Sequence, residues 1–329
     1  MNQTRMFFIA FSRSPPFTVG ITAIAHLAGI HTLDLSGCAR LAAMRIPLAG
    51  GGKETLLSEV GDVLLSLLSM RDACALRLVC REFHAAVRRH PWEDRETVIK
   101  GSIKVWRACF PRARCANVTS YSFTGGEVRT APVEDADFVH FEGLRELNMM
   151  CCQDVTDAAF VHLRGIHSLE MSRCFRLTDA ALVHLAGIQR LGMFSCRGVT
   201  DAGFVHLCGI QLLNIDACTQ LTDAAFVHLR GIKTLFMGQC SQPAITDAAF
   251  VHLQGIRTLV LDKCTQATIT GATFSSLVGI EALCIQGCSG GLIAAALGLQ
   301  LPIPTVGLIS LGGDHCEFFP WETPREGPW

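Results

Sequence analysis

Hydrophobic and polar positions follow a fixed period through the second half of the chain. The phrase Thr-Asp-Ala-Ala-Phe-Val-His-Leu-x-Gly-Ile recurs there with small variations, and Leu-x-hydrophobic-x-x-Cys follows each copy. The copies begin at Glu134, Thr156, Thr178, Thr200, Thr222, Thr246 and Thr270. The first four steps are 22 residues long and the last two are 24 residues long. Such a period predicts a stacked repeat, in which neighbouring units complete each other's hydrophobic core.

Each unit predicts a short helix, a turn and a strand. In one copy, Thr156 is a good N-cap, and Asp157 places negative charge at the helix N-terminus. The residues up to Leu163 make about two helical turns, and Gly165 can adopt the left-handed conformation that ends a helix. The segment Ile-x-x-Leu-x-Met-x-x-Cys, which ends at Cys174, matches the leucine-rich-repeat pattern. We therefore expect an α/β fold, a right-handed leucine-rich-repeat solenoid with a parallel concave sheet and short convex helices.

The remaining sequence divides into segments of different character. Gly50, Gly51 and Gly52 form a flexible joint. The expected segments are an N-terminal segment with one isolated repeat copy (1–50), a helical domain (53–95), a linker or N-terminal cap of the solenoid (96–133), seven leucine-rich repeats (134–288), and a C-terminal cap or disordered tail (289–329). The isolated copy around His26 to Cys38 cannot bury its own core, so it must pack elsewhere or stay loose.

Composition narrows the class of protein. Half of the 329 residues are hydrophobic and 17% are charged, which suits a solenoid with a continuous core. The net charge of -1 excludes a strong overall basic field, so we expect neither nucleic acid nor a membrane as partner. The apolar run from Met6 to Phe11 is too short for a signal peptide, and no stretch reaches the ~18 apolar residues of a membrane span. We expect a soluble protein of the cytoplasm or nucleus without a cofactor.

Two columns of the repeat carry residues that can bind metals. The cysteine column contains Cys38, Cys152, Cys174, Cys196, Cys218, Cys240, Cys264 and Cys288. One thiol per repeat makes a ladder and not a tetrahedral cluster, so we favour buried packing over a zinc site. The histidine column contains His26, His140, His162, His184, His206, His228 and His252. A metal site or pH sensor needs convergent partners, and because none is apparent we expect ordinary residues of the convex helices.

Strand positions beside the buried leucines alternate to the concave side, and they differ between repeats. The exposed, substrate-binding positions that this predicts are Glu146, Asn148, Met150, Glu170, Arg173, Arg190, Phe194, Asn214, Asp216, Phe236, Gln239, Asp262 and Lys263. Because they combine two phenylalanines with charges of both signs, they suit a protein or peptide partner, with the aromatic side chains as anchors. The alternative is that several of these side chains are merely solvated.

The segment from residue 56 to residue 92 has apolar residues at spacings of three and four, which predicts a compact group of short helices. Its most specific part, Leu76-x-Leu78-Val79-Cys80-Arg81-x-Phe83, resembles the Leu-x-x-Val-Cys-Arg-x-Trp/Phe phrase of the F-box. The resemblance implies an adaptor-binding set of Leu56, Glu59, Val60, Leu64, Leu65, Leu68, Leu76, Leu78, Val79, Cys80, Arg81, Phe83 and Trp92.

The segment also departs from the F-box pattern. Leu57 stands where the family has proline, Gly61 stands where it has leucine, and Ala73 fills a further apolar position. Because proline pre-organises the first turn of a helix, its loss is expected to weaken docking without abolishing it. A generic helical cap on the solenoid is the alternative interpretation of this segment.

An F-box followed by cysteine-type leucine-rich repeats resembles the F-box/leucine-rich-repeat proteins over residues 55–288. In that family the F-box docks on a Skp-type adaptor of an SCF-type cullin–RING ubiquitin ligase, and the repeats hold a protein substrate. The resemblance implies a receptor subunit that performs no chemistry itself. Two alternatives remain, a scaffold or inhibitory binding protein that recruits no ligase, and an enzyme with its site in residues 96–133 or the C-terminal tail. Neither region has a Gly-rich phosphate loop, a nucleophile elbow or metal-ligand spacing.

Overall fold

The computed structural model describes residues 32–34, 45–47, 65–66, 68–78, 81–120 and 132–300. The chain separates into two compact units. The first unit holds the residues up to Thr97 together with Val105–Ala113, and the second holds Val98–Lys104 together with the residues from Arg114 onward. The repeats lie in the second unit, which we call the solenoid.

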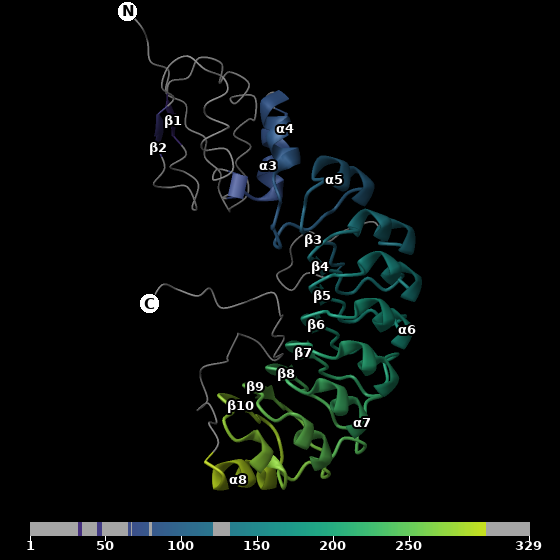
Figure 1. Cartoon of the computed structure of the whole chain (residues 1–329), viewed down its shortest axis with the longest axis vertical. Helices are drawn as coiled ribbons and strands as arrows, with labels where there is room; N and C mark the ends of the chain where they lie inside the picture. Colours follow the sequence, from purple (N-terminus) through teal and green to yellow (C-terminus); the bar gives the residue numbers. More distant parts are fainter. Residues whose placement is uncertain are drawn as a thin grey trace, which may run out of the picture. The chain divides into compact units, whose positions relative to one another are not determined.

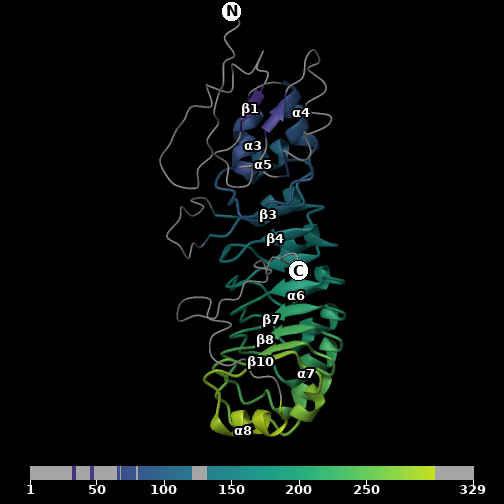
Figure 2. The ribbon, with the colours of Figure 1, turned by 90° about the vertical axis from the view of Figure 1, so that its left-hand side faces the viewer.

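One parallel sheet of eight strands runs through the solenoid (Figures 1 and 2). The strands are β3 (Cys115–Asn117), β4 (Glu146–Asn148), β5 (Ser168–Glu170), β6 (Arg190–Gly192), β7 (Leu212–Asn214), β8 (Thr234–Phe236), β9 (Thr258–Val260) and β10 (Ala282–Cys284). They lie in chain order, and equivalent residues pair, so that Leu169 lies between Leu147 and Leu191. Each repeat therefore adds one strand in an unchanged register. β3 precedes the first copy of the phrase and extends the sheet by one strand.

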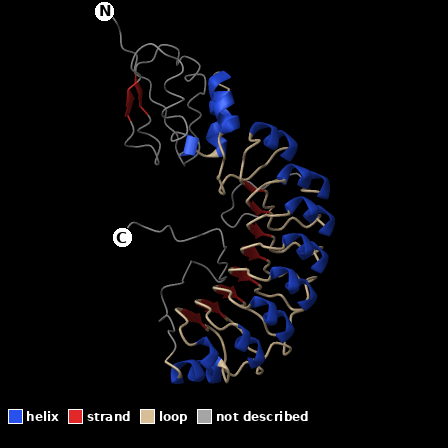
Figure 3. Ribbon diagram, in the orientation of Figure 1, coloured by secondary structure: helices blue, strands red, loops and turns tan. Residues whose placement is uncertain are grey.

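Short helices cover the side of the solenoid opposite the strands (Figure 3). They are η2 (Asp135–Phe141), η3 (Asp157–Leu163), α6 (Asp179–Leu182), η4 (Val183–Leu185), η5 (Asp201–Leu207), α7 (Asp223–Phe226), η6 (Val227–Leu229), η7 (Asp247–His252) and η8 (Phe274–Leu277), and α8 (Gly290–Gly298) follows the last strand. Most are 3₁₀ helices, because so short a segment is satisfied by tight bonds such as Ala159 N–H to the Thr156 carbonyl (3.2 Å). The predicted α/β leucine-rich-repeat solenoid is confirmed.

A continuous apolar core separates the helices from the sheet. In a typical repeat, Phe160, Leu163, Ile166, Leu169 and Met171 are all buried. Each comes from the position that the period assigned to the interior. Burying a side chain of this size contributes about 1.5–3 kcal/mol, so the repeated positions supply most of the driving force for stacking.

The predicted caps and turns are present, with one refinement. Thr156 accepts a hydrogen bond from the Ala158 N–H (3.4 Å) and so caps the helix. Gly165 has a φ of 79°, and the Ile166 N–H bonds to the Leu163 carbonyl (3.1 Å). This is a β-turn that needs positive φ at its third residue, where glycine is the least strained choice. The glycine therefore makes a tight turn between helix and strand, and does not simply stop the helix.

The aspartate of each helix ties its repeat to the next one. Asp201 accepts the Thr222 backbone N–H (2.9 Å) through Oδ1 and the Thr222 hydroxyl (2.6 Å) through Oδ2. The same two bonds join Asp135 to Thr156, Asp157 to Thr178, Asp179 to Thr200, Asp223 to Thr246 and Asp247 to Thr270. Sequence reasoning assigned Asp157 to the helix dipole and missed this link.

The first unit has a small helical core. Its described helices are α3 (Met70–Leu76) and α4 (Arg81–Arg89), and the larger part of α5 (Ile103–Cys109) belongs to it as well. Trp92 is buried, donates its indole N–H to the Val87 carbonyl (2.8 Å), and packs edge-on against Phe110. The helical prediction for this segment agrees with these described residues.

Part of the isolated repeat copy is also described. β1 (Thr32–Asp34) pairs with β2 (Arg45–Pro47) in an antiparallel arrangement. The copy therefore contributes its strand to a separate two-stranded sheet and not to the parallel sheet of the solenoid. The rest of the copy, including His26 and Cys38, lies outside the described residues. Among the helices that the structure describes, none has the length and apolar character of a membrane span.

Candidate binding surfaces

The cysteine ladder is buried between the sheet and the helices. The Cys218 thiol donates to the Met193 carbonyl (3.1 Å), and Cys196 donates to the Met171 carbonyl (3.3 Å). Burial raises the pKa of Cys196 to about 12 and that of Cys218 well above its usual value. These thiols stay neutral and link each repeat to the preceding one, so the predicted packing role is confirmed.

The histidine column lies on the convex helices, where its described members are half-buried. His162 forms an ion pair with Glu142 of the preceding repeat (2.7 Å), and the His228 ring lies 4.0 Å from the Cys208 thiol. Each contact involves a single neighbouring side chain. Within the described ranges, no group of three or more His, Cys, Asp or Glu side chains is placed to hold a metal ion.

Seven of the predicted exposed positions on the concave side are buried, so this part of the prediction is wrong. The buried residues are Glu146, Met150, Glu170, Asn214, Asp216, Phe236 and Asp262. Asn148, Arg173, Arg190 and Phe194 are half-buried, and Gln239 and Lys263 are exposed. Period-two alternation predicts on which side of the sheet a side chain lies, but it does not predict whether the neighbouring residues leave that side chain exposed or let it be buried.

Small residues on adjacent strands explain part of this burial. Glu170 is 1% exposed because its carboxylate lies over Gly192 of the next strand, in the space that a Cβ of Gly192 would occupy. The Glu170 Oε1 atom accepts the Ser172 N–H (2.9 Å). The glycine in one repeat thus lets the glutamate of the repeat before it fold flat against the sheet.

Polar side chains at the next position join adjacent repeats. The Ser172 hydroxyl accepts the Phe194 N–H (2.9 Å), and Asp262 accepts the Gln286 N–H (3.0 Å). Asp216 similarly accepts the Gly238 N–H of the next repeat, and within its own repeat its N–H is held by the Asn214 side chain (2.8 Å). These residues act as structural links at the concave side, which their residue types alone did not reveal.

Asp216 is the most perturbed acid among the described residues. Its pKa is raised to about 7, chiefly by burial and also by the nearby charge of Asp262, although hydrogen bonds from Gly238 and Asn214 lower it. Ionising the Asp216 carboxyl at neutral pH therefore lowers the stability of the folded chain.

One aromatic residue remains accessible on the concave side. Phe194 is half-buried, and the Arg173 guanidinium lies 5.2 Å from the centre of its ring, within cation–π range. Phe236, the other predicted anchor, is only 6% exposed. An aromatic contact to a partner therefore falls on Phe194 and not on Phe236.

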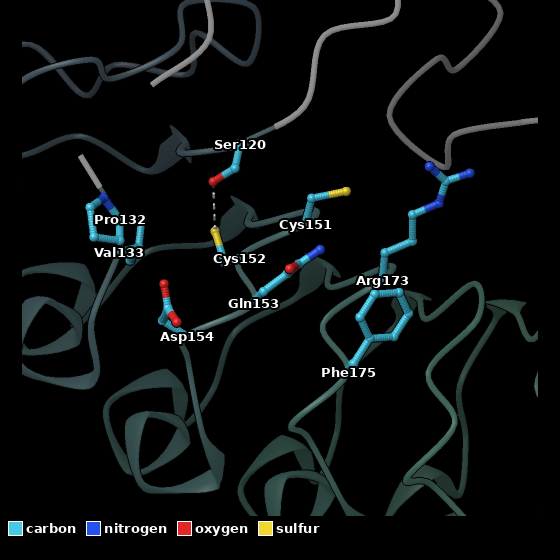
Figure 4. Close-up of a pocket in the computed structure, with 9 residues that line it drawn as sticks. All are labelled: Ser120, Pro132, Val133, Cys151, Cys152, Gln153, Asp154, Arg173 and Phe175. Atoms are coloured by element: carbon cyan, nitrogen blue, oxygen red, sulfur yellow. Dashed lines mark hydrogen bonds between the residues drawn. The ribbon is translucent and has the colours of Figure 1, made fainter. Parts of the chain in front are cut away.

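A cavity of about 580 Å³ lies beyond the carboxyl ends of β3, β4 and β5 (Figure 4). Its lining residues are Ser120, Pro132, Val133, Cys151, Cys152, Gln153, Asp154, Arg173 and Phe175. Apart from Arg173, which was among the concave positions, sequence reasoning named none of these as binding residues. Most come from loops whose sequences differ between neighbouring repeats, and this variability was the only indication in the sequence that these residues could form a binding site. The described residues of its lining include no histidine.

The F-box-like residues fall into three groups. Leu65, Leu68 and Trp92 are buried in the first unit, which leaves them almost no surface for a partner in this conformation. Leu76 and Phe83 are half-buried, Arg81 is exposed, and Leu78 is 71% exposed. The residues outside the described part are Leu56, Glu59, Val60, Leu64, Val79 and Cys80.

Comparisons with known proteins add little beyond the fold. No protein-family model matches the chain, and no curated protein matches it either. One similar solved structure is the TLR13–ssRNA13 complex, with 16% identity over 73% of this chain and 32% of that chain and a TM-score of 0.47. The mouse RP105/MD-1 complex has 16% identity over 59% of this chain and 34% of that chain, with a TM-score of 0.39. The yeast Rad7–Elc1 complex has 18% identity over 43% of this chain and 42% of that chain, with a TM-score of 0.35. The chain spans less than half the length of each of these chains. At these identities the likeness concerns the repeat architecture alone.

Proposed function

We propose that this chain is the non-catalytic substrate-recognition subunit of an SCF-type cullin–RING ubiquitin ligase, acting in the cytoplasm or nucleus. In this proposal the helical unit docks a Skp-type adaptor, and the solenoid holds a protein substrate. The chain itself transfers nothing. It raises the effective concentration of a substrate lysine near a ubiquitin-charged enzyme that the complex carries.

The exposure of Leu78 is the observation that carries the proposal. Leu78 follows α3 within the F-box-like phrase and is 71% exposed, whereas Met70 and Ala73 of α3 are buried. A large aliphatic side chain that projects from a small packed unit is suited to insertion into a partner. The phrase around it adds the family resemblance, which implies that this segment contacts an adaptor.

A charge at Leu78 tests the proposal. Leu78→Asp in the full chain should abolish co-purification with a Skp-type adaptor, because a carboxylate cannot be buried in an apolar interface without a partner. Val105→Asp is a matched control, since Val105 is 59% exposed in the same unit. This control should keep adaptor binding, and circular dichroism should show both variants folded. Adaptor binding that survives Leu78→Asp would exclude this docking surface.

A binding scaffold without ligase recruitment is the second candidate. It is favoured by Ala73, which is fully buried in α3, so the apolar position that the F-box pattern has there presents no surface to an adaptor. The two candidates differ in one result, because a scaffold binds a partner through its repeats and fails to bind the adaptor even as the unmodified chain.

A further inference from the structure

A row of cations follows the edge of the sheet at which the strands begin. In each repeat, three positions lie at this edge. They are the residue before the turn glycine, the residue after the isoleucine that follows this glycine, and the first residue of the strand. We call the cations at these positions the basic edge. One cluster contains Arg145, Arg164 and Arg190, and the second contains Arg230, Lys233 and Arg257.

The five repeats with turn glycines at 165, 187, 209, 231 and 255 hold neither Asp nor Glu at these three positions. The net charge of the whole chain, -1, conceals this local excess. The overall charge therefore gives no indication of the basic edge.

Nearby carboxylates balance only part of this charge. Glu142 is engaged with His162 (2.7 Å), and Glu281 pairs with Arg257 (3.6 Å) at the far end of the row. Glu146 is buried at the start of β4. Arg145, Arg164, Arg230 and Lys233 are exposed to solvent. An anionic partner can therefore reach most of the row.

His167 lies inside the first cluster and reports its positive field. Burial lowers the pKa of His167, and the charges of Arg145 and Arg190 lower it further against the opposing effect of Glu146. The buried His167 Nδ1 atom has no hydrogen-bond partner in the structure. A carboxylate brought to this edge would oppose the positive field of these arginines.

The spacing of the clusters sets the pattern of the partner. Strands lie ~4.8 Å apart, so the five steps from Arg145 to Arg257 span ~24 Å, or about seven residues of extended chain. One repeat lies between the clusters, and its three positions hold the neutral residues Cys208, Gln211 and Leu212, so the clusters are two strand steps (~10 Å) apart. This neutral gap corresponds to about three residues of an extended peptide.

We propose that the basic edge binds an extended acidic segment of a partner protein, with two acidic blocks separated by about three residues. A single nucleic acid strand fits less well. Its charges are evenly spaced, and the three edge positions of these repeats hold no Phe, Tyr or Trp on which a base could stack. The edge belongs to the solenoid and not to the F-box-like unit, so this inference does not depend on ligase recruitment.

Fluorescence anisotropy with three labelled probes tests the inference at ~150 mM salt, where weak long-range attraction is screened. The probes are the peptide Glu-Glu-Ser-Gly-Ser-Glu-Glu, its rearranged form Ser-Glu-Glu-Glu-Glu-Gly-Ser, and a seven-nucleotide oligouridylate. The first peptide should bind the full chain at least about five-fold more tightly than the other two probes, because only its acidic blocks match both clusters.

Matched double variants locate the site. Arg145→Gln with Lys233→Gln removes one cation from each cluster and should weaken binding of the first peptide about ten-fold. Arg176→Gln with Arg197→Gln removes the same charge from exposed loops after the strands and should leave binding unchanged. Exposed substitutions of this kind change stability little, and urea unfolding checks that both variants are folded. Equal losses in the two variants, equal binding of the two peptides, or tighter binding of the oligouridylate would each overturn the inference.

Discussion

Single side chains that are hidden from water hold adjacent repeats together. The cysteine of each repeat occupies a small buried space and gives its one donor to a carbonyl of the repeat before it, as Cys218 does to Met193. A serine could donate as well, but it is more polar, and alanine would remove this hydrogen bond. The thiol suits a buried position that needs a weak donor and an apolar surface.

Cys218→Ala should lower the free energy of unfolding by about 1–2 kcal/mol, because it removes the buried hydrogen bond to the Met193 carbonyl and opens a small void. Urea unfolding followed by circular dichroism measures this difference. Cys208→Ala is the control, since Cys208 is exposed. Cys208→Ala should change stability by less than about 0.5 kcal/mol. Equal effects of the two substitutions would contradict the structural role of the ladder.

Asp216 gives the solenoid a pH dependence of unusual sign. Its pKa in the folded chain is about 7, against an ordinary value of 3.8. The folded state therefore holds this proton more tightly than the unfolded state does. Between these two pH values, stability falls as pH rises. The folded chain holds this proton and the unfolded chain does not, so unfolding releases a proton, and a higher pH favours that release. Asp262 is the charged neighbour, and Gly238 and Asn214 are the hydrogen-bonding ones.

Asp216→Asn should remove this penalty while keeping an acceptor for the Gly238 N–H. The variant should be more stable than the parent by at least ~2 kcal/mol at pH 8, with a much smaller advantage at pH 5. Urea unfolding of both proteins at the two pH values gives the comparison. Asp154→Asn, a change at an exposed carboxyl, should show no such difference. An advantage of Asp216→Asn that does not grow with pH would contradict the assignment.

At the scale of elements, hydrogen bonds between consecutive helices join one repeat to the next. Thr222 shows how the link works, since it caps α7 through the Ala224 N–H and gives its own hydroxyl and backbone N–H to Asp201. One threonine thus belongs to two repeats at once. The helices are too short to be stable alone, so these links and the shared core fix their positions.

Asp201→Ala should destabilise the chain by about 2–3 kcal/mol, because the Thr222 N–H loses its acceptor in a part-buried position. Thermal or urea unfolding measures the loss. Asp154→Ala removes an exposed carboxylate that has no such link and should cost less than about 0.5 kcal/mol. A loss no larger than that of Asp154→Ala would mean that the aspartate serves only the helix dipole.

The period of the sequence predicted the elements well and their surfaces less well. Leu169 and Phe160 lie in the core because the spacing of apolar residues within one repeat already determines the side they face. The burial of Glu170 could not be predicted in the same way, because it depends on Gly192 in the next repeat. Contacts between repeats combine residues that vary independently, so reading one repeat at a time misses them.

At the scale of the whole molecule, the proposed function divides between the two units. The solenoid offers the basic edge, the Phe194 region and a cavity of about 580 Å³, each formed by residues that differ between repeats. The helical unit presents Leu78. The phrase around Leu78 pointed to this unit from sequence, whereas the basic edge became visible only when the sheet brought distant cations into one row.

Titration of the full chain with a purified Skp-type adaptor, followed by isothermal calorimetry, tests the ligase account most directly. The account expects saturable binding with one adaptor per chain, and co-elution of the two proteins in size-exclusion chromatography. Absence of both heat and co-elution at micromolar concentrations of a folded chain would contradict it and leave the solenoid as a binding scaffold alone.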